Sequence, residues 1–183
     1  KAIRKELGTL SLGTAEFKVQ CEQVEKQREE PYPAGWDRVE FMFSANPGEP
    51  VKPLSKIASG GELSRLLLGL KCILARRDQV ETVIFDEVDA GIGGHAAEDK
   101  ANKIKQLSEH YQVLCITHLP QIASKADEPF KVNKFLKNKR TTTEMTLLDD
   151  DNRIDELARM LAGNSVNDET IAFAKGLLKK EKE

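Results

Sequence analysis

The sequence predicts an α/β fold with a βαβ core, parallel strands flanked by helices, and an N-terminal antiparallel ribbon. Two predicted strands with apolar centres, 79–87 and 112–117, enclose a segment with helical spacing at 97–111. Strand, helix and strand in this order make a βαβ unit, whose crossover is nearly always right-handed. Two earlier segments, 15–24 and 36–44, alternate apolar and polar residues. Such alternation is typical of half-buried strands, and we expect these two to pair.

Composition limits the possible classes of protein. A chain of 183 residues with 39% hydrophobic content can bury one good core, so we expect one compact domain. The net charge of −2 gives no global basic signature for nucleic acid, so any DNA contact must come from a local patch or from parts outside this chain. The three cysteines show no disulfide or zinc spacing, which fits a reducing cytoplasm. No apolar run approaches the ~18 residues that span a membrane.

Helices, loops and strands are predicted around this core. Residues 1–7 are expected to be the last turns of a charged helix with Gly8 as its C-cap. The proline-containing segments 25–35 and 45–58 are predicted to be irregular. Residues 63–74 have the spacing of an amphipathic helix. The C-terminal third is predicted to contain a short helix at 122–126, strands at 129–135 and 141–148 joined by a basic turn at 137–140, and helices at 149–162 and 167–178.

Two adjacent carboxylates, Asp86 and Glu87, follow the first strand of the βαβ unit. Ligands of open α/β sheets bind at the carboxyl ends of the strands, so chemistry is expected here. Such a pair can divide a phosphate reaction, one acid holding Mg²⁺ and the other orienting a water. The alternative is a solvated turn that carries two acids. His118 follows the second strand at the same predicted edge and is a candidate donor to a phosphate oxygen, although a lone histidine there is more often a satisfied polar residue.

Ser59-Gly60-Gly61-Glu62 precedes the amphipathic helix. Ser-x-x-Glu before an apolar helix is a capping box, in which the serine hydroxyl accepts from the amide three residues on. A capping box does not explain the two glycines, which cost roughly 1 kcal/mol each in a helix relative to alanine. They expose bare N–H groups at a helix N-terminus, where the dipole favours an anion. The motif therefore has a second interpretation, a phosphate cradle.

Taken together, these motifs resemble those of ABC-type ATPases. Ser59-Gly60-Gly61-Glu62 resembles their signature motif, Val83-Ile84-Phe85-Asp86-Glu87 their Walker B strand with its catalytic glutamate, Asp89-Ala90-Gly91 their D-loop and His118 their switch histidine. Five segments closely resemble the sequences of the RecN family of SMC-related bacterial DNA repair proteins: 43–50, 57–65, 85–92, 115–121 and 156–163. The resemblance covers nearly the whole chain.

The resemblance implies a mechanism and a division of the protein. Two heads would sandwich two ATP molecules as a homodimer, with the Ser59-Gly60-Gly61 amides contacting the ATP of the partner. Asp86 would support Mg²⁺, Glu87 would polarise the attacking water, His118 would contact the γ-phosphate and Asp89 would couple the two sites. The full-length protein would act on DNA double-strand ends.

One motif of that family is missing from this chain. The phosphate loop, Gly-x₄-Gly-Lys-Ser/Thr, does not occur in it. The resemblance therefore implies that residues 1–183 are the C-terminal lobe of an ATPase head, with 1–8 the end of a coiled-coil helix and 9–183 the ATPase lobe. Its partner would be the N-terminal Walker A lobe, and the chain would be inactive alone. The alternatives are the head of another ABC-type or SMC-type machine, or an interaction module that has lost the chemistry.

Overall fold

The computed structural model of the protein describes residues 2–10, 12–23, 35–57, 59–74, 79–91, 94–137 and 140–179. The chain forms two compact units, Lys1–Gly91 with His110–Cys115 and Ile92–Glu109 with Ile116–Glu183, and each is described by itself. Most of the predicted loop at 25–35 and the centre of the basic turn at 137–140 lie outside the described residues. The domain boundary predicted at residue 8 stays a prediction.

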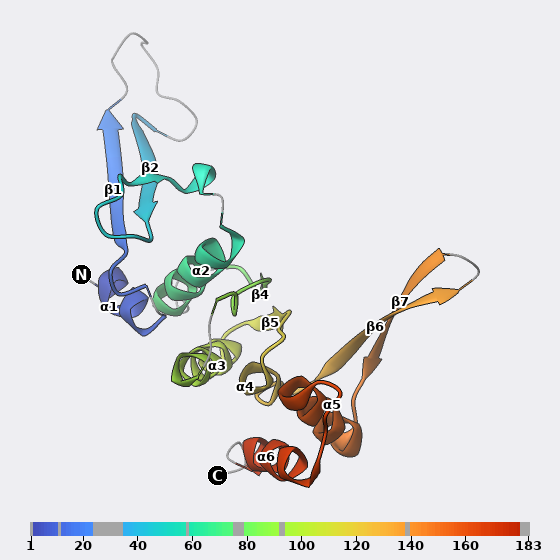
Figure 1. The fold of residues 1–183 in the computed structure, drawn as a ribbon. Coiled ribbons are helices and arrows are strands. Elements are labelled where there is room, and N and C mark those ends of the chain that lie inside the picture. The colour runs from blue at the N-terminus through green and yellow to red at the C-terminus, as the bar shows by residue number, and fades with distance from the viewer. Residues whose placement is uncertain are drawn as a thin grey trace. The chain divides into compact units, whose positions relative to one another are not determined.

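The first unit contains two helices, a helical turn and strands of two sheets (Figure 1). In chain order they are α1 (Ala2–Thr9), β1 (Glu16–Gln23), β2 (Asp37–Ser44), β3 (Lys52–Pro53), the 3₁₀ turn η1 (Leu54–Lys56), α2 (Gly60–Leu74), β4 (Thr82–Phe85) and β5 (Gln112–Cys115). The predicted ribbon is confirmed, because β1 and β2 pair antiparallel from Glu16↔Ser44 to Gln23↔Asp37. β3 adds a short third strand to β2.

The core of this unit joins the ribbon to the two helices. Leu7, Leu12, Phe17, Phe43 and Leu66 are buried together. α1 packs closely on α2, since a Cβ added at Gly69 would lie 3.6 Å from Cδ2 of Leu7 on α1 and 3.2 Å from Cδ1 of Leu10, just after that helix. The packing of α1 on α2 thus fixes the position of α2, including its first turn.

β4 and β5 pair parallel in the register Thr82↔Gln112 to Phe85↔Cys115, as the βαβ pattern predicts. The continuous apolar run Val83-Ile84-Phe85 predicts a strand that is buried on both faces, and this prediction is wrong. Val83 and Phe85 are buried, but Ile84 is 63% exposed and its cross-strand neighbour Leu114 is 50% exposed. One face of this parallel pair is therefore uncovered, although parallel sheets in other proteins are covered on both faces.

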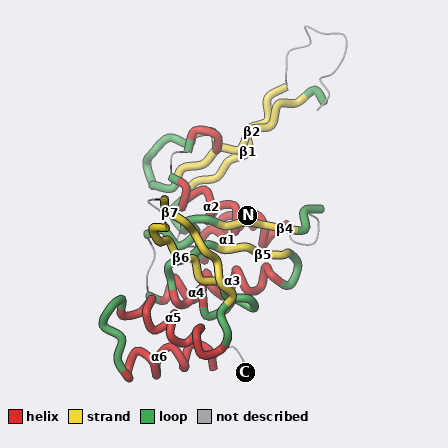
Figure 2. Tube along the Cα trace, turned by 90° about the vertical axis from the view of Figure 1, so that its right-hand side faces the viewer, coloured by secondary structure: helices red, strands yellow, loops and turns green. Residues whose placement is uncertain are grey.

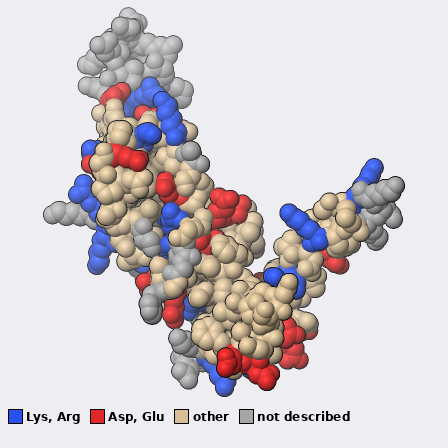
Figure 3. Space-filling model, viewed as in Figure 1, with Lys and Arg blue, Asp and Glu red and all other residues tan. Residues whose placement is uncertain are grey.

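The second unit contains the remaining helices and a hairpin (Figures 1 and 2). They are α3 (His95–Ser108), α4 (Pro120–Ala123), β6 (Phe130–Lys137), β7 (Arg140–Leu147), α5 (Asp150–Ala162) and α6 (Asp168–Lys179). β6 and β7 pair antiparallel, and α5 and α6 pack around Leu157, Ala158 and Ala174. Figure 3 shows basic side chains along the hairpin and acidic side chains around the two C-terminal helices. Asp149 caps α5 by accepting from the Asn152 amide at 2.8 Å, and Gly163 ends it with φ 61°, in agreement with the helix predicted at 149–162.

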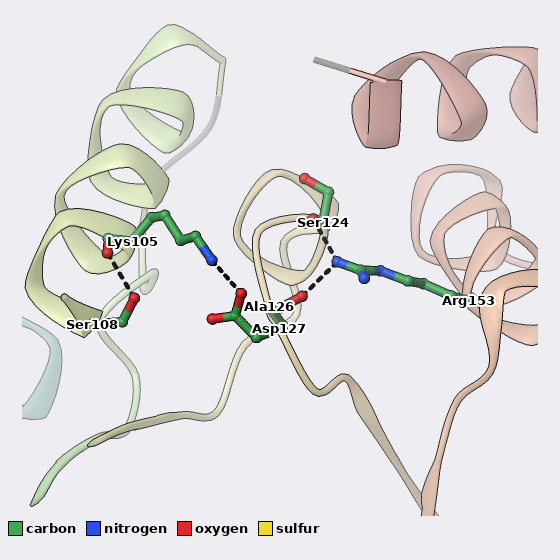
Figure 4. A network of polar contacts seen from close by, with 6 residues as sticks. All are labelled: Lys105, Ser108, Ser124, Ala126, Asp127 and Arg153. Carbon is green, nitrogen blue, oxygen red and sulfur yellow. Dashed lines mark hydrogen bonds and ion pairs between the residues drawn. The ribbon is translucent and has the colours of Figure 1, made fainter. Parts of the chain in front are cut away.

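Polar contacts brace α3, α4 and α5 against one another (Figure 4). Lys105 on α3 forms an ion pair with Asp127. Arg153 on α5 donates through Nη2 to the carbonyl oxygens of Ser124 at 2.6 Å and Ala126 at 2.7 Å. The segment after α4 is thus fixed from two sides.

Three local predictions are corrected by the structure. Gly8 does not end α1, which continues to Thr9, whose hydroxyl donates to the Glu6 carbonyl at 2.7 Å. The segment 45–58 is not wholly irregular, because β3 and η1 lie within it. The apolar spacing of α2 indicates the covered face only in part, since Leu66 is buried on that face but Leu63 and Leu67 are partly exposed, and Leu68, outside that spacing, is buried. The packing of α1 on Gly69 decides which face of α2 is covered.

Candidate functional site

The acids after β4 lie in a tight turn. Glu87 has φ 56°, a left-handed conformation that is uncommon outside glycine, and its carbonyl accepts from the Ala90 amide at 3.1 Å. Asp86 and Glu87 are exposed, whereas Asp89 is only 2% exposed. A strained backbone at a functional residue is a recurring feature of active sites. We call residues 86–91 the acidic loop.

The start of α2 has the predicted cap. The amide of Glu62 donates to the hydroxyl of Ser59 at 3.4 Å, and the helix begins at Gly60. The capping interpretation is therefore confirmed for the serine. The glycines occupy the first helical positions, as the cradle interpretation requires.

The structure brings the start of α2 against the acidic loop. A Cβ added at Gly60 would lie 2.7 Å from Oε2 of Glu87, and one added at Gly61 would lie 2.8 Å from the Cβ of Ala90 and 3.1 Å from the carbonyl oxygen of Glu87. Real Cβ atoms do not approach other atoms at 2.7 or 2.8 Å. Gly61 is therefore required for close approach, because its neighbours are a Cβ and a backbone oxygen, whereas a side chain at residue 60 would displace the flexible carboxylate of Glu87.

Two residues that the sequence reasoning missed fasten this contact. The hydroxyl of Ser64 donates to the carbonyl of Asp86 at 2.6 Å, and Nη1 of Arg65 donates to the carbonyl of Ala90 at 2.8 Å. Each residue lies four positions after one of the two glycines, and residues at i and i+4 share a helix face. That spacing was a usable signal in the sequence.

Burial and charge shift two groups of the first unit. Burial raises the pKa of the Cys115 thiol to about 12, with further contributions from the negative charges of Asp89 and Asp86. Burial lowers the pKa of Arg65, while the carboxylate of Glu62 acts in the opposite direction. The end of β5 thus lies within the field of the acidic loop.

His118 belongs to the second unit, two residues before α4. Its side chain is exposed, and the preceding hydroxyl of Thr117 accepts from the amide of Leu119 at 3.0 Å. Phe85 and Cys115, the last residues of β4 and β5, are paired at the same end of the parallel pair.

The carboxylates of Asp86 and Glu87 suit a Mg²⁺ ion whose remaining ligands are waters and phosphate oxygens. Among the described residues no cluster of at least three histidine, cysteine or acidic side chains is placed to hold a metal. Mg²⁺ is commonly bound by one or two carboxylates together with waters and substrate phosphates. The exposed carboxylates of Asp86 and Glu87 fit that arrangement.

Comparison with solved structures gives the class of fold. The Smc head domain with a coiled coil and joint from Pyrococcus yayanosii aligns with a TM-score of 0.52 and 18% identity, over 100% of this chain and 28% of that chain. The fold is that of an SMC-type head. No protein-family model matches the sequence.

Comparison with curated sequences is more specific. The DNA repair protein RecN of Treponema pallidum is 48% identical over 177 residues, which are 94% of this chain and 30% of that protein. The RecN of Halalkalibacterium halodurans is 43% identical over 178 residues, 97% of this chain and 32% of that protein, and that of Bacillus subtilis is 50% identical over 145 residues, 79% and 25%. The chain is a RecN-like sequence and corresponds to a C-terminal portion of these proteins. It spans less than a third of the length of these relatives.

Proposed function

We propose that this chain is the C-terminal lobe of an ABC-type ATPase head that uses ATP-driven dimerisation in DNA double-strand-break repair and recombination. The contact between the glycines at the start of α2 and the acidic loop is the observation that carries this proposal. A helix N-terminus with bare amides suits phosphate, and paired carboxylates suit Mg²⁺ and a water. The repair role is taken from the names of the RecN relatives.

In the proposed reaction each residue has one task. The amides of Gly60 and Gly61, with Ser59 as their cap and Glu62 as its partner, bind the γ-phosphate of ATP carried by the partner head. Asp86 would hold Mg²⁺, which would neutralise phosphate charge when bound. Glu87 orients and polarises the attacking water, His118 donates to the γ-phosphate, and Asp89 couples the two sites across the dimer.

The phosphate loop is proposed to come from the N-terminal Walker A lobe of the same protein. The exposed apolar face at Ile84 and Leu114 supports a partner there, because a parallel sheet is stable when both faces are covered. On this account the chain alone has no complete nucleotide site. It becomes an ATPase only when that lobe is present.

DNA ends are proposed to be held by the full-length protein, in the cytoplasm and associated with the nucleoid. No described helix is long and apolar enough to cross a membrane. A second candidate function, the head of another SMC-type machine, is favoured by the similarity to the Smc head fold. The third candidate function is an interaction module without catalysis, which would dimerise but would not hydrolyse ATP.

Glu87→Gln tests the assignment of the catalytic acid. The exchange removes the negative charge that polarises water and keeps the size of the side chain. Full-length protein with this change should bind ATP and form a stable head dimer, measured by light scattering, while hydrolysis falls by about 10²-fold or more. Hydrolysis at the normal rate would overturn the role of Glu87, and so would failure to dimerise with ATP.

A further inference from the structure

We propose that Arg65 is a positioning residue that couples the phosphate cradle at the start of α2 to the acidic loop. It would make the site that receives the partner's ATP and the site that hydrolyses the head's own ATP respond to each other. This inference rests on the proposed function and adds to it a residue that none of the sequence motifs assigns.

Arg65 contacts both elements with one guanidinium. Its Nη1 donates to the Ala90 carbonyl at 2.8 Å, and the same atom lies 3.3 Å from where a Cβ of Gly61 would be. The guanidinium is planar and its donors have fixed directions, so it fixes the loop more firmly than a flexible ammonium would. Gly61 and Ala90 therefore have a common neighbour.

Ser64 provides the second attachment of the same loop. Its hydroxyl donates to the carbonyl of Asp86 at 2.6 Å, at the start of the loop, whereas Arg65 holds Ala90 near the end. Glu87 lies between the two attachments in its left-handed conformation. A displacement of the first turn of α2 would therefore carry the backbone of Glu87 with it.

The placement of Arg65 at this position is unfavourable for folding. Nε of Arg65 is buried and finds no hydrogen-bond partner among the residues that the structure describes. Burial also lowers the pKa of the guanidinium. A buried donor without a partner opposes folding, so the side chain is not explained by stability alone. A role in transmitting movement of the first turn of α2 to the acidic loop explains why the charged donor Arg65 lies at this position.

The consequence for a head dimer is cooperativity. The cradle would receive ATP from the partner, while Glu87 would act on ATP bound in its own head. A rigid link between them gives a coupling free energy between the two sites, which is reciprocal for binding. Turnover should therefore depend sigmoidally on ATP concentration while Arg65 is present.

The test compares Arg65→Lys with the unsubstituted full-length protein by two measurements. The first is amide hydrogen exchange of peptides covering 86–91 without nucleotide, where the Ala90 amide is bonded to Glu87. Exchange should rise by roughly tenfold or more, the loss expected for one hydrogen bond to a charged donor. The second is the Hill coefficient for ATP hydrolysis, which should fall towards 1.

Two further variants keep the test decisive. Arg153→Lys is the matched control, because Arg153 also binds backbone carbonyls but in the second unit, and it should leave both measurements unchanged. Ser64→Ala should raise exchange in 86–91 by a smaller factor than Arg65→Lys. Unchanged exchange at 86–91 in Arg65→Lys would overturn the inference whether or not ATP is hydrolysed. Absence of hydrolysis by the unsubstituted protein would instead contradict the proposed function.

Discussion

Gly60 and Glu87 approach so closely that no side chain fits between them, since a Cβ at residue 60 would lie 2.7 Å from the Glu87 carboxylate. The two residues are separated by the whole of α2 and β4 in the sequence. The helix N-terminus and the acid after β4 are thus in direct contact within the first unit. The motifs at 59–62 and 86–91, which occur in this order in the sequence, are therefore also neighbours in space.

Gly60→Ala should affect catalysis more than folding. The atom that a new Cβ would meet is the end of a flexible side chain, so Glu87 can move aside at a cost of about 1 kcal/mol or less. The displaced carboxylate would no longer orient water, and ATP turnover should fall at least tenfold. Urea unfolding and ATPase assays of the full-length protein measure the two effects. Equal turnover in the variant would contradict the contact.

Gly61→Ala should destabilise the fold. Its Cβ would meet the Cβ of Ala90 and the backbone of Glu87, neither of which can rotate away. Overpacking of this kind costs about 1–3 kcal/mol, more than the gain of about 1 kcal/mol in helix propensity. Gly176→Ala in α6 is the control, since nothing lies within 4 Å of its added Cβ, and it should stabilise. Urea unfolding compares the two, and a more stable Gly61→Ala variant would refute this packing.

Element order was predictable from sequence because it depends on local patterns. The period-2 alternation gave β1 and β2, and the Asp149 and Gly163 caps gave both ends of α5. Local patterns do not report which face of an element is covered. Ile84 is apolar and exposed because the described residues leave that face of β4 open.

The acids and glycines of the candidate site could be predicted from the sequence, because binding of phosphate and Mg²⁺ requires these residue types. The link between them could not, because Ser64 and Arg65 act on backbone carbonyls of a loop more than twenty residues away. Gly8 failed as a cap for a similar reason. It has no need of positive φ when packing of α1 on α2 favours two more helical residues, Gly8 and Thr9.

Cys115 should resist alkylation in the folded protein. Its pKa is raised to about 12 by burial and by the charges of Asp89 and Asp86, so very little thiolate exists at pH 8. Cys21 is exposed and serves as the internal control. After iodoacetamide treatment, peptide mass spectrometry should find Cys21 modified and Cys115 modified only after unfolding. Similar rates at both cysteines in the folded protein would show that the thiol is not buried beside these acids.

Glu156 should stabilise the second unit in a pH-dependent way. Burial acts to raise the pKa of Glu156, but hydrogen bonds from Arg159 and Lys131 outweigh it and the pKa lies below its ordinary value of 4.5. A group with a lowered folded-state pKa contributes stability above its unfolded pKa and loses it as pH falls through the folded value. Glu156→Gln should therefore cost about 1 kcal/mol at pH 7 and progressively less as the pH falls below the ordinary value of 4.5 and through the lower folded-state pKa.

The control for this prediction is an exposed pair. Lys18 and Glu16 form an ion pair at 2.9 Å with both side chains largely in solvent, whereas Lys131 reaches the more buried Glu156 at 2.6 Å. Glu16→Gln should change urea unfolding less than Glu156→Gln at pH 7. A cost for Glu156→Gln that is the same at pH 7 and pH 3.5 would contradict the assigned charge interaction.

The central claim is that this chain supplies half of an ATPase site. Its most direct test is ATP hydrolysis by the chain alone, by the chain with the N-terminal Walker A lobe supplied, and by the same pair with Glu87→Gln. The account predicts hydrolysis only in the unsubstituted pair, together with ATP-dependent dimerisation. Hydrolysis by the chain alone would contradict the account, and so would a folded pair that hydrolyses no ATP.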